Sequence, residues 1–206
     1  MPNSVLMSAI LPTTAEARNI VQIPKFVDWR LTAADLVLRD ALGEPLNEPL
    51  KAYGYSMDNK KLELGRIYHL FGPFGQHPIS GEAMIRHDQT AQSDLGAHTI
   101  NRQEIAGNAY ITSKGKVMDA EYDNVHNSNG SWNLTVVAEH EFVVPEPTEA
   151  FDFEVIYWFG YYTPHGSQWK RIKSNAIMSF SGKLVGKDPA SGRFIVDVID
   201  YAFIEV

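Results

Sequence analysis

An aromatic stretch followed by a basic one is the part of this sequence best equipped to bind a ligand. Residues 151–162 read FDFEVIYWFGYY, and between residues 163 and 195 six Lys and Arg residues stand against a single acid, Asp188. Aromatic rings stack on nucleobases or sugars, and cations pair with phosphates, which are the two contributions that single-strand recognition needs. We therefore expect a ligand-binding face made of Trp158, Tyr161, Tyr162, His165, Trp169, Lys170, Arg171, Lys173, Lys183 and Arg193.

The same residues also have a purely structural interpretation. In a strand, alternate side chains point to opposite faces, so Trp158 would lie on one face and Tyr157 and Phe159 on the other, where one face fills the core. Basic residues at sheet edges commonly protect against edge-to-edge aggregation. A protein-interaction module, without a nucleic acid or sugar ligand, therefore stays open as an alternative.

An enzyme or carrier is the other alternative. Glu139-His140-Glu141 would place the histidine on one strand face and both glutamates on the other. No His-Glu-x-x-His spacing, Gly-x-Ser-x-Gly elbow or phosphate loop occurs, so neither a metal nor another cofactor is expected. A barrel interior could instead hold an apolar small molecule, as in isomerase-like or cyclase-like enzymes, lined by Tyr53, Tyr55, Tyr68, Phe71, Phe74 and Trp132.

The elements that must position these residues are mainly strands. From Tyr53 onward, short aromatic and β-branched runs alternate with Gly, Pro, Asn and Asp, which is typical of an antiparallel β-barrel or sandwich. Residues 1–50 are expected to form an N-terminal arm, docked through Phe26 and Trp29, and one short helix. That helix would start near Thr32 and end at Gly43.

An internal repeat is the basis for dividing residues 51–206. NAYITSKGKV at 108–117 matches NAIMSFSGKL at 175–184, and matches in the same order precede and follow this pair. We therefore expect two related strand units, 65–143 and 151–204, in which Gly115 and Gly182 are equivalent. Because the second unit is small, both units should close one shared barrel or sandwich.

The C-terminal region resembles a known fold. Residues 180–187 (FSGKLVGK), a Gly-containing turn and residues 194–203 (FIVDVIDYAF) are similar to the glycine-bent first strand and following hairpin of oligonucleotide/oligosaccharide-binding (OB) barrels. The resemblance implies a small β-barrel that binds single-stranded nucleic acid or an oligosaccharide on a curved strand face.

Composition limits the remaining possibilities. The 206 residues include no cysteine, which excludes disulfides and thiol chemistry, and the net charge of −7 argues against binding duplex DNA or anionic membrane through bulk charge. The apolar runs are strand-sized, and the N-terminus lacks a basic signal-like region, so we expect an intracellular protein without a signal peptide or membrane span. Exposed sheet edges would allow a homo-oligomer.

Overall fold

Strands make up most of the molecule. The computed structural model describes residues 3–21, 25–40, 42–97, 101–123, 133–145, 148–160, 163–164 and 166–204. The strands are β1 (Val5–Pro12), β2 (Arg18–Asn19), β3 (Val27–Arg39), β4 (Pro45–Met57), β5 (Arg66–Gln76), β6 (Ala83–Asp88), β7 (Gln92–Ala97), β8 (Ala109–Asp123), β9 (Asn133–Pro145), β10 (Thr148–Phe159), β11 (Ile177–Lys187) and β12 (Phe194–Phe203). The helices are η1 (Asp58–Lys60), α1 (Arg102–Ile105) and η2 (Gly166–Arg171). The predicted mainly-β fold is confirmed.

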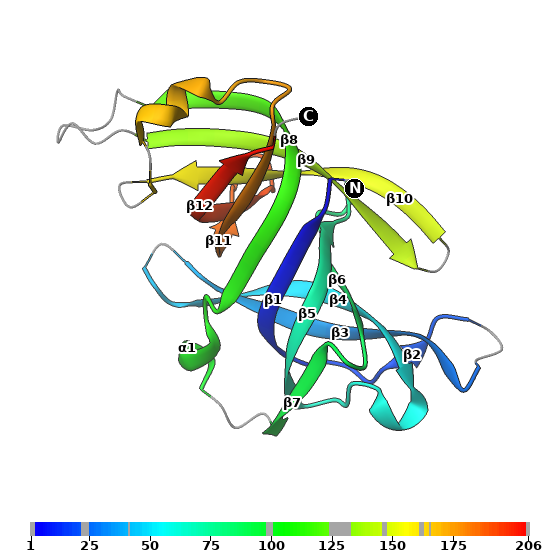
Figure 1. Ribbon diagram of the computed structural model, residues 1–206. Coiled ribbons are helices and arrows are strands. Elements are labelled where there is room, and N and C mark those ends of the chain that lie inside the picture. Colours follow the sequence, from blue (N-terminus) through cyan, green and yellow to red (C-terminus); the bar gives the residue numbers. More distant parts are fainter. Residues whose placement is uncertain are drawn as a thin grey trace.

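Two barrels with the same strand order form the two lobes of Figure 1. Barrel 1 uses β1, β3, β4, β5 and β6, and barrel 2 uses β8, β9, β10, β11 and β12. In both, the second and third strands pair antiparallel, the fourth pairs antiparallel with the first, and the fifth pairs antiparallel with the fourth and parallel with the third. The first and second strands meet along β8–β9 in barrel 2 and through the Thr13–Ala34 bridge in barrel 1.

The first strands of the two barrels pair with each other. β1 and β8 run antiparallel, from Val5 opposite Ser113 to Ala9 opposite Ala109. Met7 and Ile111 are opposite one another and both buried, so the cores of the two barrels lie under the same side of this joined sheet. One hydrophobic cluster accordingly runs through both barrels.

Further contacts fix the barrels against each other. The Gln76 side-chain amide in barrel 1 donates to the Gly192 carbonyl in barrel 2 at 2.7 Å. Gly75 packs so closely on the other barrel that an added Cβ would lie 2.3 Å from Cγ of Phe142. The chain is therefore one packed body rather than two tethered ones.

The helix predicted to start near Thr32 is wrong, and so is the N-terminal arm. Residues 27–39 form β3, which pairs with β4 along its full length and buries Leu36 and Leu38 in the core. Gly43, predicted as a helix cap, lies with a φ of +84° in the hairpin turn, where the Asp40 carboxylate accepts hydrogen bonds from the backbone N–H groups of Leu42 and Glu44. The N-terminal residues form β1, an interior strand between β5 and β8.

The structural repeat has different boundaries from the one read in the sequence. Gly115 lies in β8 and Gly182 in β11, the first and fourth strands of the same barrel, and these strands pair with each other. The two related units run from β1 to β6 and from β8 to β12, so the boundaries 65–143 and 151–204 cut across them.

Membrane-spanning helices were searched for in the described residues. None of the helices there has the length and apolar character needed to cross a bilayer.

Candidate functional site

A row of side chains crosses the outer surface of both barrels. Residues directly opposite one another on paired strands share a face of the sheet. The register places Trp158 (β10) opposite Asp197 (β12), Asp197 opposite Lys183 (β11), Lys183 opposite Tyr110 (β8), Tyr110 opposite Ser8 (β1), and Ser8 opposite Phe71 (β5). We call these six residues the outer row.

The rings of the outer row are exposed to solvent. Trp158 is 41% exposed, Tyr110 49% and Phe71 46%. Their strand neighbours on the opposite face, such as Tyr157 and Ile111, are buried, so the alternation that fills the core also presents these rings. Between Tyr110 and Phe71 lies Ser8, whose hydroxyl is 2.8 Å from Nε2 of His69.

A cleft continues the row across barrel 1. It has a volume of about 270 Å³ and is lined by Leu6, Trp29, Phe71, Gly72, Pro73, Arg86, His87, Asp88 and Ala91. The Trp29 ring on its wall is 5.2 Å from the ring of Tyr55, which is 43% exposed. Exposed aromatic surface therefore extends from Tyr110 across the barrel junction to Tyr55.

Basic side chains accompany this surface. Lys183 lies within the outer row, and the same outer face of β8 carries Lys114 and Lys116, which are four and six residues along the strand from Tyr110. Burial raises the pKa of the Asp197 carboxyl, the one acid of the row, while the neighbouring Lys183 acts in the opposite direction. Arg86 adds a cation at the cleft.

The outer face of β9 and β10 is acidic instead. Glu139 is directly opposite Glu154, and Glu141 is opposite Asp152. Arg193 forms an ion pair with Glu154, and Lys116 is opposite Glu139, which offsets part of the repulsion. An anionic ligand would be repelled from this face and directed towards β8, β1 and β5.

The ligand-binding residues predicted from the sequence do not form one patch. Trp158 and Lys183 belong to the outer row. Lys170, Arg171 and Lys173 are exposed near the end of β12, where the Arg171 guanidinium lies 4.9 Å from the centre of the Phe203 ring. Arg193 lies just before the other end of that strand. Tyr161, Tyr162 and His165 lie outside the described residues.

Trp169 must be removed from the candidate stacking residues. It is buried, its ring meets Phe159 edge to face at 5.6 Å, and its indole N–H donates to the Pro164 carbonyl. η2 closes this end of barrel 2, so the tryptophan packs in the core rather than facing solvent.

Sequence reasoning missed Tyr110 and Trp29 as surface rings, and it considered Tyr55 and Phe71 as the lining of a barrel interior, in the alternative of an enzyme or carrier. A usable signal was present in residues 109–117, where small or apolar residues alternate with Tyr110, Thr112 and two lysines. That alternation predicts a strand with one buried and one solvent-facing side. It could not show which other strands bring rings beside Tyr110.

His140 is a core residue. It is fully buried, with Nδ1 3.0 Å from the Lys114 carbonyl oxygen and Nε2 2.9 Å from the Tyr157 hydroxyl, which in turn is 2.7 Å from the Ser113 hydroxyl. Burial lowers the pKa of His140 to about 4 and raises the pKa of the equally buried Tyr157. This network satisfies buried polar groups away from solvent, as a structural network does.

The lining suggested for a ligand inside a barrel is dispersed. Tyr53, Tyr68 and Phe74 are packed in the core, and Tyr55 and Phe71 are exposed. Trp132 lies outside the described residues. Within the described ranges, no three His, Asp or Glu side chains are grouped as metal ligands would be.

Comparison with known proteins identifies the fold. No family model and no curated protein sequence matches the chain. A deletion mutant of the single-stranded DNA-binding protein from Thermus aquaticus has a similar structure, with a TM-score of 0.52 and 14% identity over 99% of this chain and 95% of that one. The wild-type form of that protein gives a TM-score of 0.48 and 16% identity over 99% and 93%. The strand order of each barrel and the first of these likenesses show that this chain has the OB fold.

Proposed function

We propose that the chain binds single-stranded nucleic acid along the outer row and the adjoining cleft. The observation that carries this proposal is the outer row itself. It joins exposed rings of both barrels and a lysine of barrel 2 on one surface. A solved structure with the same fold is that of a single-stranded DNA-binding protein, which supports this ligand class.

Ring spacing suits stacking of separate bases. Neighbouring strands lie about 4.8 Å apart, so Tyr110 and Phe71, two strands apart, present their rings roughly 10 Å from each other along the sheet. Stacking accepts any base and contributes about 1–3 kcal/mol per base. Trp29 and Tyr55 would extend the same path beyond the cleft.

Charge favours the same path. Because the chain carries a net charge of −7, phosphate binding must depend on local cations. Lys183 and Lys114 supply them at the barrel junction, and the carboxylates of β9 and β10 oppose a path on that side. Lys170, Arg171 and Lys173, which follow Trp158 in the chain, are proposed as secondary phosphate contacts for a strand that continues past Trp158.

Fluorescence anisotropy with a labelled single-stranded DNA oligonucleotide tests the proposal. Phe71→Ala and Tyr110→Ala should each weaken binding by about 1–3 kcal/mol, while Leu42→Ala, which truncates an exposed apolar side chain outside the outer row and the cleft, should not. Binding should weaken between about 50 mM and about 200 mM salt, because phosphate contacts release counterions. Absence of binding, or wild-type affinity in both aromatic variants, would overturn the proposal. Salt-insensitive binding of an oligosaccharide instead would favour the uncharged ligand.

Two expectations stay predictions. A homo-oligomer would form through a sheet edge, for which β7 is a candidate because it pairs only with β5 in the described part of the chain. Light scattering on the purified chain tests it. An intracellular location is the other, and fractionation of the source cells tests it.

A further inference from the structure

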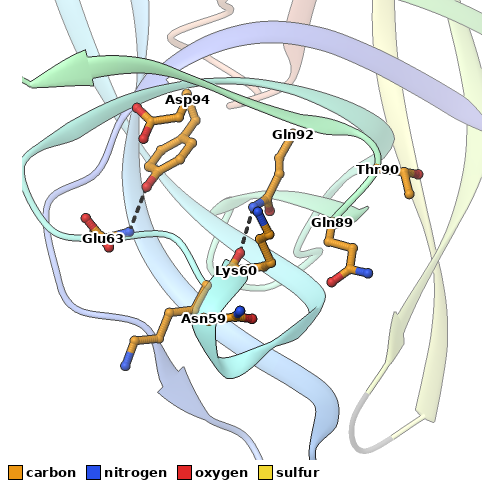
Figure 2. Close-up of a pocket in the computed structure, with 9 residues that line it drawn as sticks. Asn59, Lys60, Glu63, Gln89, Thr90, Gln92 and Asp94 are labelled. Carbon is orange, nitrogen blue, oxygen red and sulfur yellow. Dashed lines mark hydrogen bonds between the residues drawn. The ribbon is translucent and has the colours of Figure 1, made fainter.

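A polar pocket lies beside the cleft on barrel 1, across a short turn. It has a volume of about 390 Å³ and is lined by Asn59, Lys60, Lys61, Glu63, Tyr68, Gln89, Thr90, Gln92 and Asp94 (Figure 2). Residues 88–91 separate the two hollows, since Asp88 and Ala91 line the cleft whereas Gln89 and Thr90 line the pocket. The pocket volume falls in the range of about 300–1,000 Å³ that is typical of small-molecule sites.

The turn between the two hollows is held in one shape. The Asp88 carboxylate accepts hydrogen bonds from the Thr90 backbone N–H at 2.7 Å, the Thr90 hydroxyl at 2.5 Å and the Ala91 backbone N–H at 3.2 Å. These bonds lower the pKa of Asp88, so the turn is intact at neutral pH. The Gln89 backbone N–H donates to the Tyr55 carbonyl at 3.2 Å, which ties the pocket to the aromatic end of the cleft.

One hydrogen-bond acceptor in the pocket lacks a donor. The Nε2 amide of Gln92 donates to the Lys60 carbonyl at 2.6 Å, one of the dashed bonds in Figure 2, and this bond fixes the orientation of the amide. Its other atom, Oε1, is buried and has no hydrogen-bond partner among the described residues. Leaving a buried acceptor unpaired is costly, so a group that supplies an N–H here would be bound favourably.

The neighbouring groups offer a donor and two cations. Oε1 of Gln89 accepts a hydrogen bond from the Met57 backbone N–H at 3.4 Å. The Nε2 amide of Gln89 has no acceptor among the described residues, so it is able to donate to a ligand. Both amides line the same pocket, and an acceptor and a donor are the groups that pair with the edge of a nucleobase; unstacked bases are recognised in this way. Two carboxylates, Glu63 and Asp94, also line the pocket, and both pair with Arg66. Lys60 and Lys61 are the cations left to bind the attached phosphate, although Lys61 also lies 3.8 Å from the Asp58 carboxylate.

We propose that this pocket takes up one nucleobase, with its phosphate on Lys60 and Lys61, and so gives the chain a preference for one base. Gln92 would accept a hydrogen bond from the base and Gln89 would donate one. The proposal rests on the proposed function, because a bound strand would bring the base to the pocket. Binding of a single nucleotide can nevertheless be measured without any strand. A sugar would satisfy the amides but not the two lysines, so the nucleotide is the better match.

Titration of the full chain with each of the four deoxynucleoside monophosphates, followed by NMR, tests the pocket. At least one should bind and shift the side-chain amide signals of Gln89 and Gln92. Gln92→Leu and Lys60→Ala should each weaken that binding at least fivefold. Ser93→Ala is the matched control, because Ser93 is the next residue of β7 and points to its other face.

Three results would overturn the proposal. These are no binding of any monophosphate, undiminished binding in both Gln92→Leu and Lys60→Ala, and equal shifts with glucose. Lys60 has an exposed side chain, so its variant stays informative if Gln92→Leu does not fold.

A second readout separates this pocket from the outer row. Phe71→Ala should lose oligonucleotide affinity and keep its affinity for the monophosphate. If the wild-type chain binds the monophosphate but no oligonucleotide, the proposed function fails and the pocket stands. If oligonucleotides bind but their affinity is the same for homopolymers of every base, the pocket proposal fails and the proposed function stands.

Discussion

The exposure of each aromatic ring depends on whether its face of the strand or helix meets the core. Trp158 and Trp169 are eleven positions apart in the same region of the sequence, yet Trp158 faces solvent and Trp169, within η2, is buried. Tyr110 and Phe71 are distant in the chain but lie on either side of Ser8. Composition therefore indicates which residue types could bind a ligand, whereas the register of the strands, which the sequence does not display, determines which of them share one surface.

Acid should destabilise the fold through His140. In the folded chain this histidine stays neutral down to a pKa of about 4, whereas in the unfolded chain it protonates near 6.5. The unfolded state therefore binds more protons between these two values, so the free energy of unfolding should fall as the pH drops from 6.5 to 4, by about 3 kcal/mol. Burial also lowers the pKa of His87, so that residue acts in the same direction.

Urea unfolding at about pH 7 and about pH 4.5 checks this dependence. His140→Gln should be less stable at neutral pH, because the buried network loses hydrogen bonds, but its stability should change less between the two pH values. His77→Gln, at a partly exposed position, should keep the wild-type pH dependence. A wild-type pH dependence in His140→Gln would contradict the assignment.

At the scale of elements, the predictable strands were those with clear alternation. The hairpin of β11 and β12 was read correctly as two paired strands, because buried and surface residues alternate there and a Gly-containing turn joins them. Its place was read wrongly, since it supplies the fourth and fifth strands of barrel 2 rather than a first strand and the hairpin after it. β3 was misread because Leu36, Val37 and Leu38 are consecutive and Gly43 follows them. Pairing with β4 overrides that local pattern, and Val37 is buried separately against Ile105 and Ala106.

The junction strand β8 should not tolerate proline. Thr112 lies opposite Leu6 of β1 on one side and opposite Ser181 of β11 on the other, so it is not at a sheet edge. Thr112→Pro removes a ladder N–H from an interior strand and should cost on the order of 4 kcal/mol. Thr112→Ala, which keeps the N–H, should stay close to the wild-type value. Thermal unfolding followed by circular dichroism compares the two, and equal stability would contradict the pairing.

The whole molecule should unfold as one unit. The hydrophobic cluster and the Gly75–Phe142 contact both span the barrels, so neither barrel keeps its core when the other opens. Calorimetry should show a single transition. Gly75→Ala should lower the midpoint of that transition by adding a Cβ against the Phe142 ring, at a cost of about 1–3 kcal/mol.

Gly186→Ala is the matched control for that experiment. No atom lies within 4 Å of the position of its added Cβ, so the change should leave the midpoint nearly unaltered. Two separate transitions in the wild-type chain, of which Gly75→Ala moves only one, would show that the barrels unfold independently.

The antiparallel pairing of β1 with β8 determines how the two barrels are oriented relative to a nucleic acid strand that crosses both of them. The leading strands of two barrels with equal topology run in opposite directions, so the barrels are related by an approximate half-turn about their junction. A nucleic acid strand has no such symmetry, because its 5′ and 3′ ends differ. A single strand lying across the junction would therefore meet one barrel heading forwards and the other heading backwards, so the two halves cannot read it with the same set of side chains. The amide pocket lies on barrel 1 and the acidic face on barrel 2, which is consistent with two barrels that contact a strand through different side chains.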